Sequence, residues 1–360
     1  MNQRPSLTGE NRLIDWLRRR PDGSLIGDDS AVLPPGGPFA VTLDHQIAGV
    51  HFPSDLDPAL IARRLLAVNL SDLAAMGASP AYAFLALAAP PGFDHERFFT
   101  ALLAACRRYG LRLAGGDLAK SPERLVASLT LIGTQAEGER WLLRSGAIPG
   151  HDLWLGGSIG ESAAGRLLIE RGARLRGSRV ELPAHLEEVS SLRGAARRAV
   201  RRHLDPQPQL ALGRWLATQK QGAAMDVSDG LARDLHRLCR ESGTGAEIAA
   251  EALPFSSRFL PLCEAIGADP LALALGGGED YVLLFTLPAG LAPPAEFGCR
   301  RIGTITRRRS LLLIQGGARR PLPDLGWDHL AGHEKTPAAP GSFRSRRAVK
   351  PISGRGLSGS

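Results

Sequence analysis

Six short acidic segments constrain this chain more than any other feature of its sequence. Each places Asp or Glu close to glycine or other small residues, and several follow an apolar, strand-like run. Glycine lets the backbone turn tightly and approach a ligand, so carboxylates there are well placed to face a common cavity. A surface turn explains any one of them, but six together favour a fold that gathers them at one site. The segments are Gly27-Asp28-Asp29, Thr42-Leu43-Asp44, Asn69-Leu70-Ser71-Asp72, Gly115-Gly116-Asp117, Asp226-Val227-Ser228-Asp229-Gly230 and Gly276-Gly277-Gly278-Glu279-Asp280.

Strand-like and helical patterns alternate in the first half of the chain, which predicts mixed α/β structure there. Asp57 followed by Pro58 is typical of a helix N-cap and first turn, so a helix is expected from there to Met76. Another helix is expected from about His95, and Gly110 is placed to end it. We also expect a helix at 11–20 and strands at 39–43, 82–88, 111–114 and 125–132.

The second half repeats this alternation after a break. The chain turns at 145–150 and restarts with an apolar strand, so we expect one domain in 1–145 and another in 146–330. The stretch 331–360 is rich in Gly, Pro, Ser and Arg, which predicts a disordered basic tail. In the second domain we expect strands at 153–155, 223–227, 281–286, 301–305 and 311–314, and helices from 161 onward and at 183–202, 209–220 and 231–240.

Composition favours a globular protein of the cytoplasm. A chain of 360 residues with 44% apolar residues supplies enough material for two domain cores. The four cysteines lie far apart, which suggests neither a zinc site nor a disulfide framework and fits a reducing compartment. The first 20 residues lack an apolar signal segment, and the longest apolar run, 81–89, is too short to cross a bilayer. We therefore expect no membrane attachment.

The net charge of +8 raises the alternative of a nucleic-acid-binding protein, with Arg-rich stretches at 197–202 and 307–309 as further candidates. The charge is unevenly placed, however: 331–360 holds six Lys or Arg and one Glu, which leaves about +3 for the rest. Apart from Phe343, the tail has no aromatic residue on which a base would stack. We expect a solvated tail and no specific nucleic-acid partner.

The gathered carboxylates predict bound magnesium. Crowded carboxylates repel one another unless a cation is present, and Mg²⁺ usually takes one or two carboxylates plus water and phosphate oxygens. Neither G-x-x-x-x-G-K-[ST] nor G-x-G-x-x-G occurs, so the commonest nucleotide-binding loops are excluded. Two features stay open. The segment 156–162 is either a tight turn or a phosphate-binding junction, and His51 is either a packed histidine or a contact for an anionic substrate.

These segments and their neighbours resemble, in the same order, the motifs of thiamine-monophosphate kinases. The likeness runs from about residue 10 to Leu330, and an ordered set of this length is highly specific. The matching motifs are Ile26 to Ala31, Ala48-Gly49-Val50-His51-Phe52, Ala67 to Ala78, Gly115-Gly116-Asp117, Met225 to Leu231, Gly277 to Tyr281, and Gly326-Trp327-Asp328-His329.

The resemblance implies the aminoimidazole-ribonucleotide-synthetase-like architecture: an N-terminal α/β domain whose strands pair across a homodimer, and a C-terminal α/β domain. It also implies phosphorylation of thiamine phosphate by ATP, with several Mg²⁺ ions, to give thiamine diphosphate. By family similarity, Asp72, Asp117 and Arg144 act in catalysis. Metal ligands would be Asp29, Thr42, Asp44, Asp72, Asp117, Asp226 and Asp229; ATP contacts would be Gly116, Asp117, Arg144 and Ser228; thiamine phosphate contacts would be His51, Glu279 and Trp327.

Such chemistry needs no general base, because a phosphate acceptor is already largely anionic near neutral pH. It needs positioning and neutralisation of charge. Other enzymes of the same superfamily are the rival interpretation: selenophosphate synthetase, aminoimidazole ribonucleotide synthetase and the hydrogenase-maturation dehydratase. The first normally carries a reactive Cys before the equivalent of Gly27 and the third ends in Cys, and neither feature occurs here.

Five residues depart from the family pattern, and all are expected at the rim of the metal site. His45 and Gln46 follow Asp44 where a small hydroxyl residue and then an apolar one are usual, Leu118 and Ala119 replace two common threonines, and Val282 replaces a usual glutamate. We expect these departures to affect rate and substrate detail more than reaction class.

Overall fold

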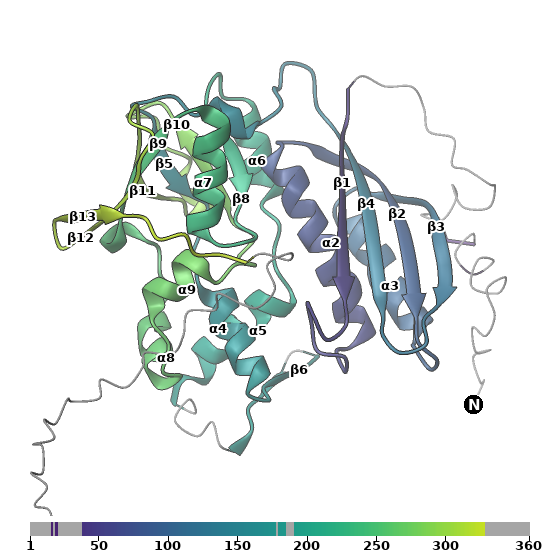
Figure 1. The fold of residues 1–360 in the computed structure, drawn as a ribbon. Coiled ribbons are helices and arrows are strands. Elements are labelled where there is room, and N and C mark those ends of the chain that lie inside the picture. The colour runs from purple at the N-terminus through teal and green to yellow at the C-terminus, as the bar shows by residue number, and fades with distance from the viewer. Residues whose placement is uncertain (1–15, 17–18, 21–37, 178, 185–190, 328–360) are drawn as a thin grey trace, which may run out of the picture.

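The structure, a computed structural model, describes residue 16 and residues 19–20, 38–177, 179–184 and 191–327 (Figure 1). The expected mixed α/β architecture is confirmed, with a four-stranded, a seven-stranded and a two-stranded sheet in these residues. Three predictions lie wholly or mainly outside them: the helix at 11–20, the acidic segment that contains Asp29, and the tail at 331–360.

The four-stranded sheet belongs to the first part of the chain and has the order β1-β4-β2-β3. Strands β2 and β3 are parallel and connected through a helix, whereas the other neighbours are antiparallel. Helices α2 and α3 cover one face of this sheet (Figure 1). The elements are β1 (Ala40–Ile47), α2 (Pro58–Ala75), β2 (Ser79–Ala89), α3 (His95–Arg108), β3 (Arg112–Lys120) and β4 (Val126–Thr134).

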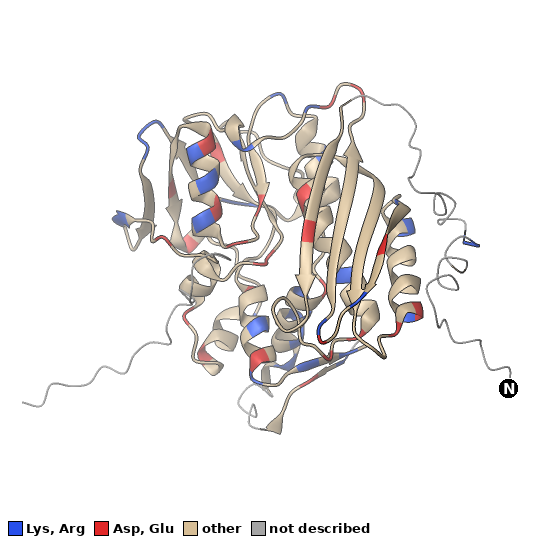
Figure 2. Cartoon of the chain, turned by 45° about the vertical axis from the view of Figure 1, so that its right-hand side comes forward, with Lys and Arg blue, Asp and Glu red and all other residues tan. Residues whose placement is uncertain are grey.

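No helix of the described residues covers the other face of this sheet, and Figure 2 shows few charged residues along its strands. On edge strand β1 and just before it, three large apolar side chains are more than half exposed: Phe39 by 58%, Val41 by 57% and Leu43 by 54%. Their neighbours Thr42 and Asp44 are less exposed, since alternate residues of a strand point to opposite faces. The uncovered face is therefore partly apolar.

Both predicted helix starts in this part are confirmed. Asp57 accepts a hydrogen bond from the Ala59 amide at 2.8 Å, and Pro58 occupies the first turn of α2. At the other end of α3, Gly110 has a φ of 72°, which glycine adopts readily. Local sequence therefore sets the ends of these helices.

The second part of the chain forms the seven-stranded sheet, with the order β13-β12-β9-β11-β5-β10-β8. Helix α7 packs beside β8, and α4, α5, α8 and α9 gather in a separate helical layer (Figure 1). Its strands are β5 (Asp152–Leu155), β8 (Ala224–Asp226), β9 (Gly245–Ala249), β10 (Leu283–Leu287), β11 (Arg300–Thr306), β12 (Leu311–Gln315) and β13 (Ala318–Pro321). Its helices are α4 (Glu161–Glu170), α5 (Arg193–Leu204), α6 (Leu210–Ala217), α7 (Leu231–Ser242), α8 (Phe259–Ala265) and α9 (Pro270–Gly276). The minor elements are the hairpin β6 (Arg174–Arg176) and β7 (Arg179–Glu181), and the 3-10 turns η2 (Arg144–Gly146), η4 (Ala250–Ala252) and η5 (Ala295–Phe297).

Some predicted boundaries were wrong. Strands β1 and β3 extend beyond the predicted ends at 43 and 114, so Asp44 and Asp117 lie within strands rather than in bends after them. Helix α5 begins at Arg193 rather than at 183. Strand β9 and helices α8 and α9 were not predicted. The sequence of β9, Gly-Ala-Glu-Ile-Ala, has weak strand propensity, and pairing with β11 and β12 keeps it extended.

Helix α2 connects the two parts of the protein. One side packs on the four-stranded sheet, and the other contacts α6 and strand β8 of the second sheet. The largest apolar core runs from the first sheet through α2 to α4, α5 and α8, so it crosses the boundary predicted at residue 145. The division into two domains there stays a prediction.

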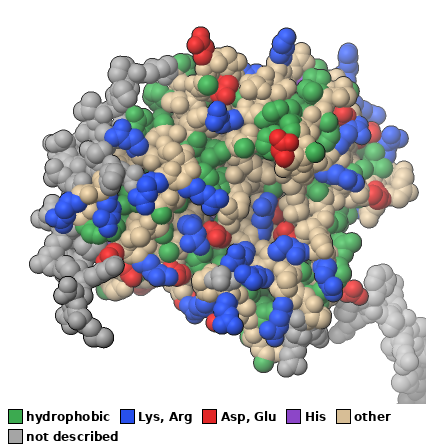
Figure 3. Space-filling model, turned by 180° about the vertical axis from the view of Figure 1, so that it is seen from behind, with side chains coloured by type: hydrophobic (Ala, Val, Ile, Leu, Met, Phe, Trp, Pro, Cys, Tyr) green, Lys and Arg blue, Asp and Glu red, His purple; other side chains and the backbone are tan. Residues whose placement is uncertain are grey.

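Part of the basic charge at the described surface is paired. Arg174 and Arg176 both reach Asp55 at 3.2 Å, and Arg166 pairs with Glu170. Figure 3 shows acidic side chains interspersed among the basic ones on the face that it presents. No single helix among the described residues is long and apolar enough to cross a membrane. Helices α8 and α9 reach that length only as a pair bent by 106°.

Candidate active site

A cavity of about 970 Å³ lies where β1, α2 and the ends of β8 and α9 meet. Pockets for small ligands and cofactors usually have about 300–1,000 Å³. Eight predicted site residues, from segments far apart in the sequence, line this one cavity: Asp44, His51, Asp72, Asp226, Ser228, Asp229, Glu279 and Trp327. The fold thus brings together most of the acidic segments.

Strand β1 and helix α2 place the first two carboxylates. The side-chain oxygen of Asn69 accepts a hydrogen bond from the Asp44 amide at 3.1 Å, which fixes the open edge of β1 to the helix. Asp72 lies one turn further along α2, and the Thr42 hydroxyl donates to its carboxylate. Thr42 therefore positions Asp72 from the strand, although it does not itself line the cavity.

The end of β8 supplies Asp226, and the segment after it supplies Ser228 and Asp229. The Ser71 hydroxyl donates to the Asp226 carboxylate at 2.7 Å, which ties this segment to α2. Buried Asp234 on α7 accepts from the amides of Ser228 and Asp229, each at 3.0 Å. Sequence reasoning missed Asp234. An acidic residue in the first turn of a helix that follows an acidic loop is the signal that indicates it.

The carboxylates at this end of the cavity raise one another's pKa values. Burial, followed by repulsion from Asp226 and Asp229, raises the pKa of Asp44 to about 6. Burial and repulsion from Asp44 raise the pKa of Asp72 to about 6, against the opposing effects of Thr42 and Arg144. Burial and repulsion from Asp72 raise the pKa of Asp226 to about 7. Among the described residues, burial and repulsion at this acidic end thus outweigh the effect of nearby cations.

Glu279, at the other end, has cationic and hydrogen-bonding partners within the protein. Its carboxylate pairs with Arg64, and His203 Nδ1 lies 3.3 Å from the other carboxylate oxygen. Burial raises the pKa of Glu279, but attraction to Arg64, His203 and His51 outweighs it, and the net shift is downward. Its φ of 57° is unusual for a residue with a side chain. The amide of Glu279 donates to the Ser228 carbonyl at 2.7 Å, which joins the two ends of the cavity.

His51 and Trp327 lie at the wall of the same cavity. His51 Nδ1 accepts a hydrogen bond from the Ile47 amide at 3.0 Å, so the neutral ring carries its proton on Nε2. The Trp327 amide donates to the Asp229 carbonyl at 2.9 Å, and the residue is 39% exposed. The structure thus favours a cavity residue over a purely packed histidine at position 51.

Four predicted site residues, Thr42, Gly116, Asp117 and Arg144, do not line the cavity, and Asp29 lies outside the described residues. The β-sheet register aligns Asp117 with Ala86, Ser128 and His45 in one row across the sheet. His45 is adjacent to Asp44 on β1, so this row lies on the opposite face from Asp44. Gly116, beside Asp117, allows no side chain, since a Cβ would lie 1.9 Å from the Leu85 carbonyl oxygen.

Arg144 begins the 3-10 turn η2 and is exposed. It does not line the cavity, yet its charge lowers the pKa values of both Asp72 and Asp226. The guanidinium therefore acts electrostatically on the acidic end of the site. Contact with a bound nucleotide stays a prediction.

The segment 156–162 is a tight turn rather than an open phosphate site. The Asp280 carboxylate accepts from the Gly160 amide at 2.8 Å and from the Ser162 amide at 3.2 Å. The first amides of α4 are therefore already bound by a carboxylate. Asp280 has a structural partner, which the acidic segment 276–280 alone did not reveal.

The five departures from the family pattern lie in different environments. His45 and Gln46 both line the cavity: His45 is exposed, with Nδ1 2.5 Å from the Ser128 hydroxyl oxygen, and Gln46 is buried. Ala119 is exposed and Leu118 is partly buried on β3. Val282 is fully buried in the core of the second sheet. It packs as a core residue, away from the cavity lining.

Within the described residues, no three His, Cys, Asp or Glu side chains are grouped closely enough to hold a metal ion by themselves. The donor set still suits magnesium, because Asp44, Asp72 and Asp226 offer carboxylate oxygens and Thr42 a hydroxyl. Magnesium usually completes its shell with water and substrate phosphates. Such an ion therefore takes only some of its oxygen ligands from the protein.

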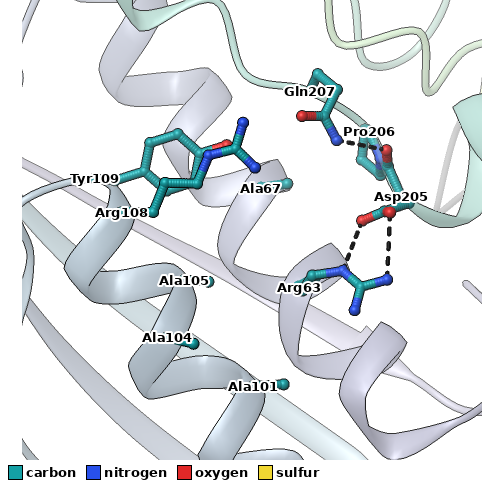
Figure 4. A pocket seen from close by; sticks show the side chains of 10 residues that line it. All are labelled: Arg63, Ala67, Ala101, Ala104, Ala105, Arg108, Tyr109, Asp205, Pro206 and Gln207. Carbon is teal, nitrogen blue, oxygen red and sulfur yellow. Dashed lines mark hydrogen bonds and ion pairs between the residues drawn. The ribbon is translucent and has the colours of Figure 1, made fainter.

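A second, smaller cavity of about 290 Å³ lies between α2, α3 and the segment after α5 (Figure 4). Alanine side chains line much of it, and Arg63 pairs with Asp205 at its edge. None of the predicted site residues reaches this cavity. The larger cavity is therefore the candidate active site.

Comparisons with known proteins identify relatives of the whole chain. The family described as AIR synthase related protein, N-terminal domain, matches residues 27–135. The thiamine-monophosphate kinase of Salmonella typhimurium is 40% identical over 267 residues, 73% of this chain and 76% of the relative. That of Escherichia coli strain K12 is 37% identical over 320 residues, 85% of this chain and 91% of the relative.

Solved structures give the same answer for the fold. The structure of AaThiL complexed with AMPPCP and TMP aligns with a TM-score of 0.69 and 30% identity, over 91% of this chain and 99% of that one. The hydrogenase maturation protein HypE in complex with ATP aligns with a TM-score of 0.67, over 91% of this chain and 97% of that one. Its identity is only 20%, so this likeness shows the shared fold alone.

Proposed function

The chain belongs to the thiamine-monophosphate kinase family, and from that membership we infer that its cavity transfers a phosphoryl group from ATP to thiamine phosphate. The products are thiamine diphosphate and ADP. The observation that carries this conclusion is the convergence of eight predicted site residues on one cavity of about 970 Å³. The similar structure of AaThiL is complexed with both AMPPCP and TMP, which supports binding of two ligands by one protein of this fold.

We propose that different residues along the cavity contact the two substrates. Ser228 and Arg144 are proposed to contact ATP, and His51, Glu279 and Trp327 to contact thiamine phosphate. His51 offers its Nε2 proton to an anionic group, and the Trp327 indole suits the face of a cationic ring. The acceptor phosphate is already largely anionic, so positioning and charge neutralisation are the main requirements.

We propose that the acidic end of the cavity holds magnesium, through Asp44, Asp72 and Asp226, with Thr42, Asp229 and Asp29 as further ligands. The raised pKa values of the first three support this, since they mark negative charge that the protein does not balance. Bound magnesium would neutralise charge on the transferring phosphoryl group. Asp72, on α2, keeps its carboxylate directed by the Thr42 hydroxyl.

We also propose that the enzyme is a homodimer built on the uncovered face of the four-stranded sheet. The exposed apolar residues of β1 support this, because a partner chain would remove them from water. Gly116 and Asp117 lie on β3, and the Asp117 side chain belongs to this uncovered face. In the dimer, these two residues of one chain would therefore contact the other chain. Mixing inactive Asp72→Asn and Asp117→Asn proteins tests this: restored activity is expected if the two chains share sites, and no restoration contradicts sharing.

We also propose that the protein is located in the cytoplasm. The four cysteines Cys106, Cys239, Cys263 and Cys299 are all free thiols, as expected in a reducing compartment.

The direct test is to incubate the purified full-length protein with thiamine phosphate, ATP and Mg²⁺. We expect thiamine diphosphate and ADP in equal amounts, and no product of either kind in excess EDTA. Turnover in excess EDTA would contradict the magnesium proposal alone. Phosphorylation of another substrate with thiamine phosphate left inert would contradict the substrate assignment.

A further inference from the structure

Two adjacent arginines on α2 have different environments. Arg63 is partly exposed, with 40% of its side chain accessible, and forms an ion pair with Asp205 beside the smaller cavity (Figure 4). Arg64 is fully buried behind the wall of the active-site cavity. An arginine is rarely buried completely unless its charge is paired and its N–H groups are bonded.

The three nitrogens of Arg64 contact three different partners. Nε donates to the Gln46 side-chain oxygen at 2.9 Å, Nη1 to the His203 carbonyl, and Nη2 to the Glu279 carboxylate. These partners come from β1, α5 and the turn after α9. Among them, the side chains of Gln46, His203 and Glu279 line the cavity, so Arg64 connects three parts of its wall from behind.

Glu279 is held from two sides. One carboxylate oxygen pairs with Arg64 and the other lies 3.3 Å from His203 Nδ1. His203 is itself fixed, because Nδ1 also lies 3.2 Å from the Ser162 hydroxyl. Burial lowers the pKa of His203 to about 4, so the ring is neutral at neutral pH and Arg64 is the main positive partner of Glu279.

We propose that Arg64 is a positioning residue that acts through Glu279 to orient thiamine phosphate. This inference rests on the proposed role of Glu279 as a substrate contact. A carboxylate fixed in one direction attracts the positively charged ring system of thiamine, whereas a carboxylate free to rotate loses part of that contact. The guanidinium suits this task because its planar fork reaches three acceptors at once, and the single ammonium of lysine does not.

The main experiment compares Arg64→Lys with Arg63→Lys, two equivalent changes at adjacent positions. Arg64→Lys keeps the buried charge but loses the fork, and KM for thiamine phosphate should rise by about 10-fold. The kcat should fall by less than about 3-fold, and KM for ATP should stay within about 2-fold. Arg63→Lys should change none of these by more than about 2-fold, because Arg63 lies outside the active-site cavity.

A double mutant separates positioning from a general structural role. In a Glu279→Gln background, Arg64→Lys should raise KM for thiamine phosphate by less than about 2-fold, since the group through which it acts has changed. An equal factor in both backgrounds would overturn the inference. So would an unchanged KM for thiamine phosphate in folded Arg64→Lys protein.

If Arg64→Lys does not fold, the Gln46→Ala variant tests the inference instead. This change leaves the buried charges paired and removes one anchor of the guanidinium, so a rise of about 3-fold in KM for thiamine phosphate alone is expected. No change in that KM would overturn the inference. The wild-type assay distinguishes failure of the proposed function from failure of this inference. Wild-type protein that does not phosphorylate thiamine phosphate contradicts the proposed function rather than the role of Arg64.

Discussion

The two ends of the active-site cavity contain the same kind of group in opposite electrostatic states. At the acidic end, Asp44, Asp72 and Asp226 have raised pKa values, because burial and mutual repulsion oppose their charge. At the other end, the pKa of Glu279 is lowered, because Arg64 and His203 stabilise its charge against the effect of burial.

This difference indicates what each end requires from outside the protein. Glu279 is balanced within the fold, so its direction and charge are set before any ligand arrives. The carboxylates of the acidic end keep raised pKa values, which suits the proposed magnesium ions with substrate phosphates. On the proposed roles, a single cavity combines a preformed contact for substrate with a region completed by its ligands.

The largest expected effect tests the acidic end through catalysis. Asp72→Asn keeps the volume of the side chain and removes its charge, so kcat should fall by about 100-fold or more. Steady-state kinetics at saturating Mg²⁺ measure this, with circular dichroism to confirm the fold. A folded variant with nearly normal kcat would show that Asp72 is not part of the catalytic charge balance.

The next test compares the two ends by stability in the absence of ligands. Glu279→Gln leaves buried Arg64 without its counter-charge and should lower the free energy of unfolding by about 2 kcal/mol. Asp72→Asn relieves repulsion and should raise it by on the order of 1 kcal/mol. Urea unfolding in EDTA measures both. Changes of the same sign would contradict the contrast between the two ends.

A smaller effect is expected at Trp327, which separates thiamine binding from nucleotide binding. Trp327→Ala should raise KM for thiamine phosphate by about 10-fold and leave KM for ATP nearly unchanged, because packing on a ring stabilises ground and transition states alike. Kinetics with each substrate varied in turn provide the measurement. An unchanged KM for thiamine phosphate would remove Trp327 from the substrate site.

The smallest effect concerns Asp57, a carboxylate that is paired with an arginine outside the cavity. Hydrogen bonding from Arg97 lowers the pKa of Asp57, although burial partly opposes the shift. Its charge therefore adds stability above its ordinary pKa of 3.8, and this contribution is lost as the pH falls through its lower native value. Asn caps a helix as well as Asp, so Asp57→Asn should reduce stability by about 0.5 kcal/mol at pH 7.

Urea unfolding of both proteins at pH 7 and at pH 3 checks this last prediction. The difference between them should shrink at the lower pH. A difference that grows on acidification would mean that the ion pair with Arg97 does not set the pKa of Asp57.

Local sequence signals predicted the elements whose ends they control. Asp57-Pro58 fixed the start of α2, and Gly110 the end of α3, since capping and positive φ depend on adjacent residues. The same signal, Asp269-Pro270, begins α9 and was available in the sequence. Strand β9 was not predictable in this way, because its hydrogen bonds come from strands far along the chain.

The candidate site divides in the same manner. The ordered acidic motifs identified Asp44, Asp72, Asp226 and Glu279, since residue type and spacing are properties of the sequence. Arg64 had a weaker signal: a charged residue four positions after buried Leu60 and three after buried Ile61, on the apolar stripe of α2. Only the folded structure shows that its partners are the residues at positions 46, 203 and 279.

The sequence by itself determined the family, the reaction class and the set of acidic residues, because these depend on which side chains are present and in what order. Only the tertiary structure decided that Asp117 lies on the opposite face of the sheet from Asp44, and that Glu279 is paired while Asp72 is not. The physical reason is that sheet register, burial and charge pairing arise between segments distant in sequence. A carboxylate's state depends on which groups the fold brings within a few ångströms of it.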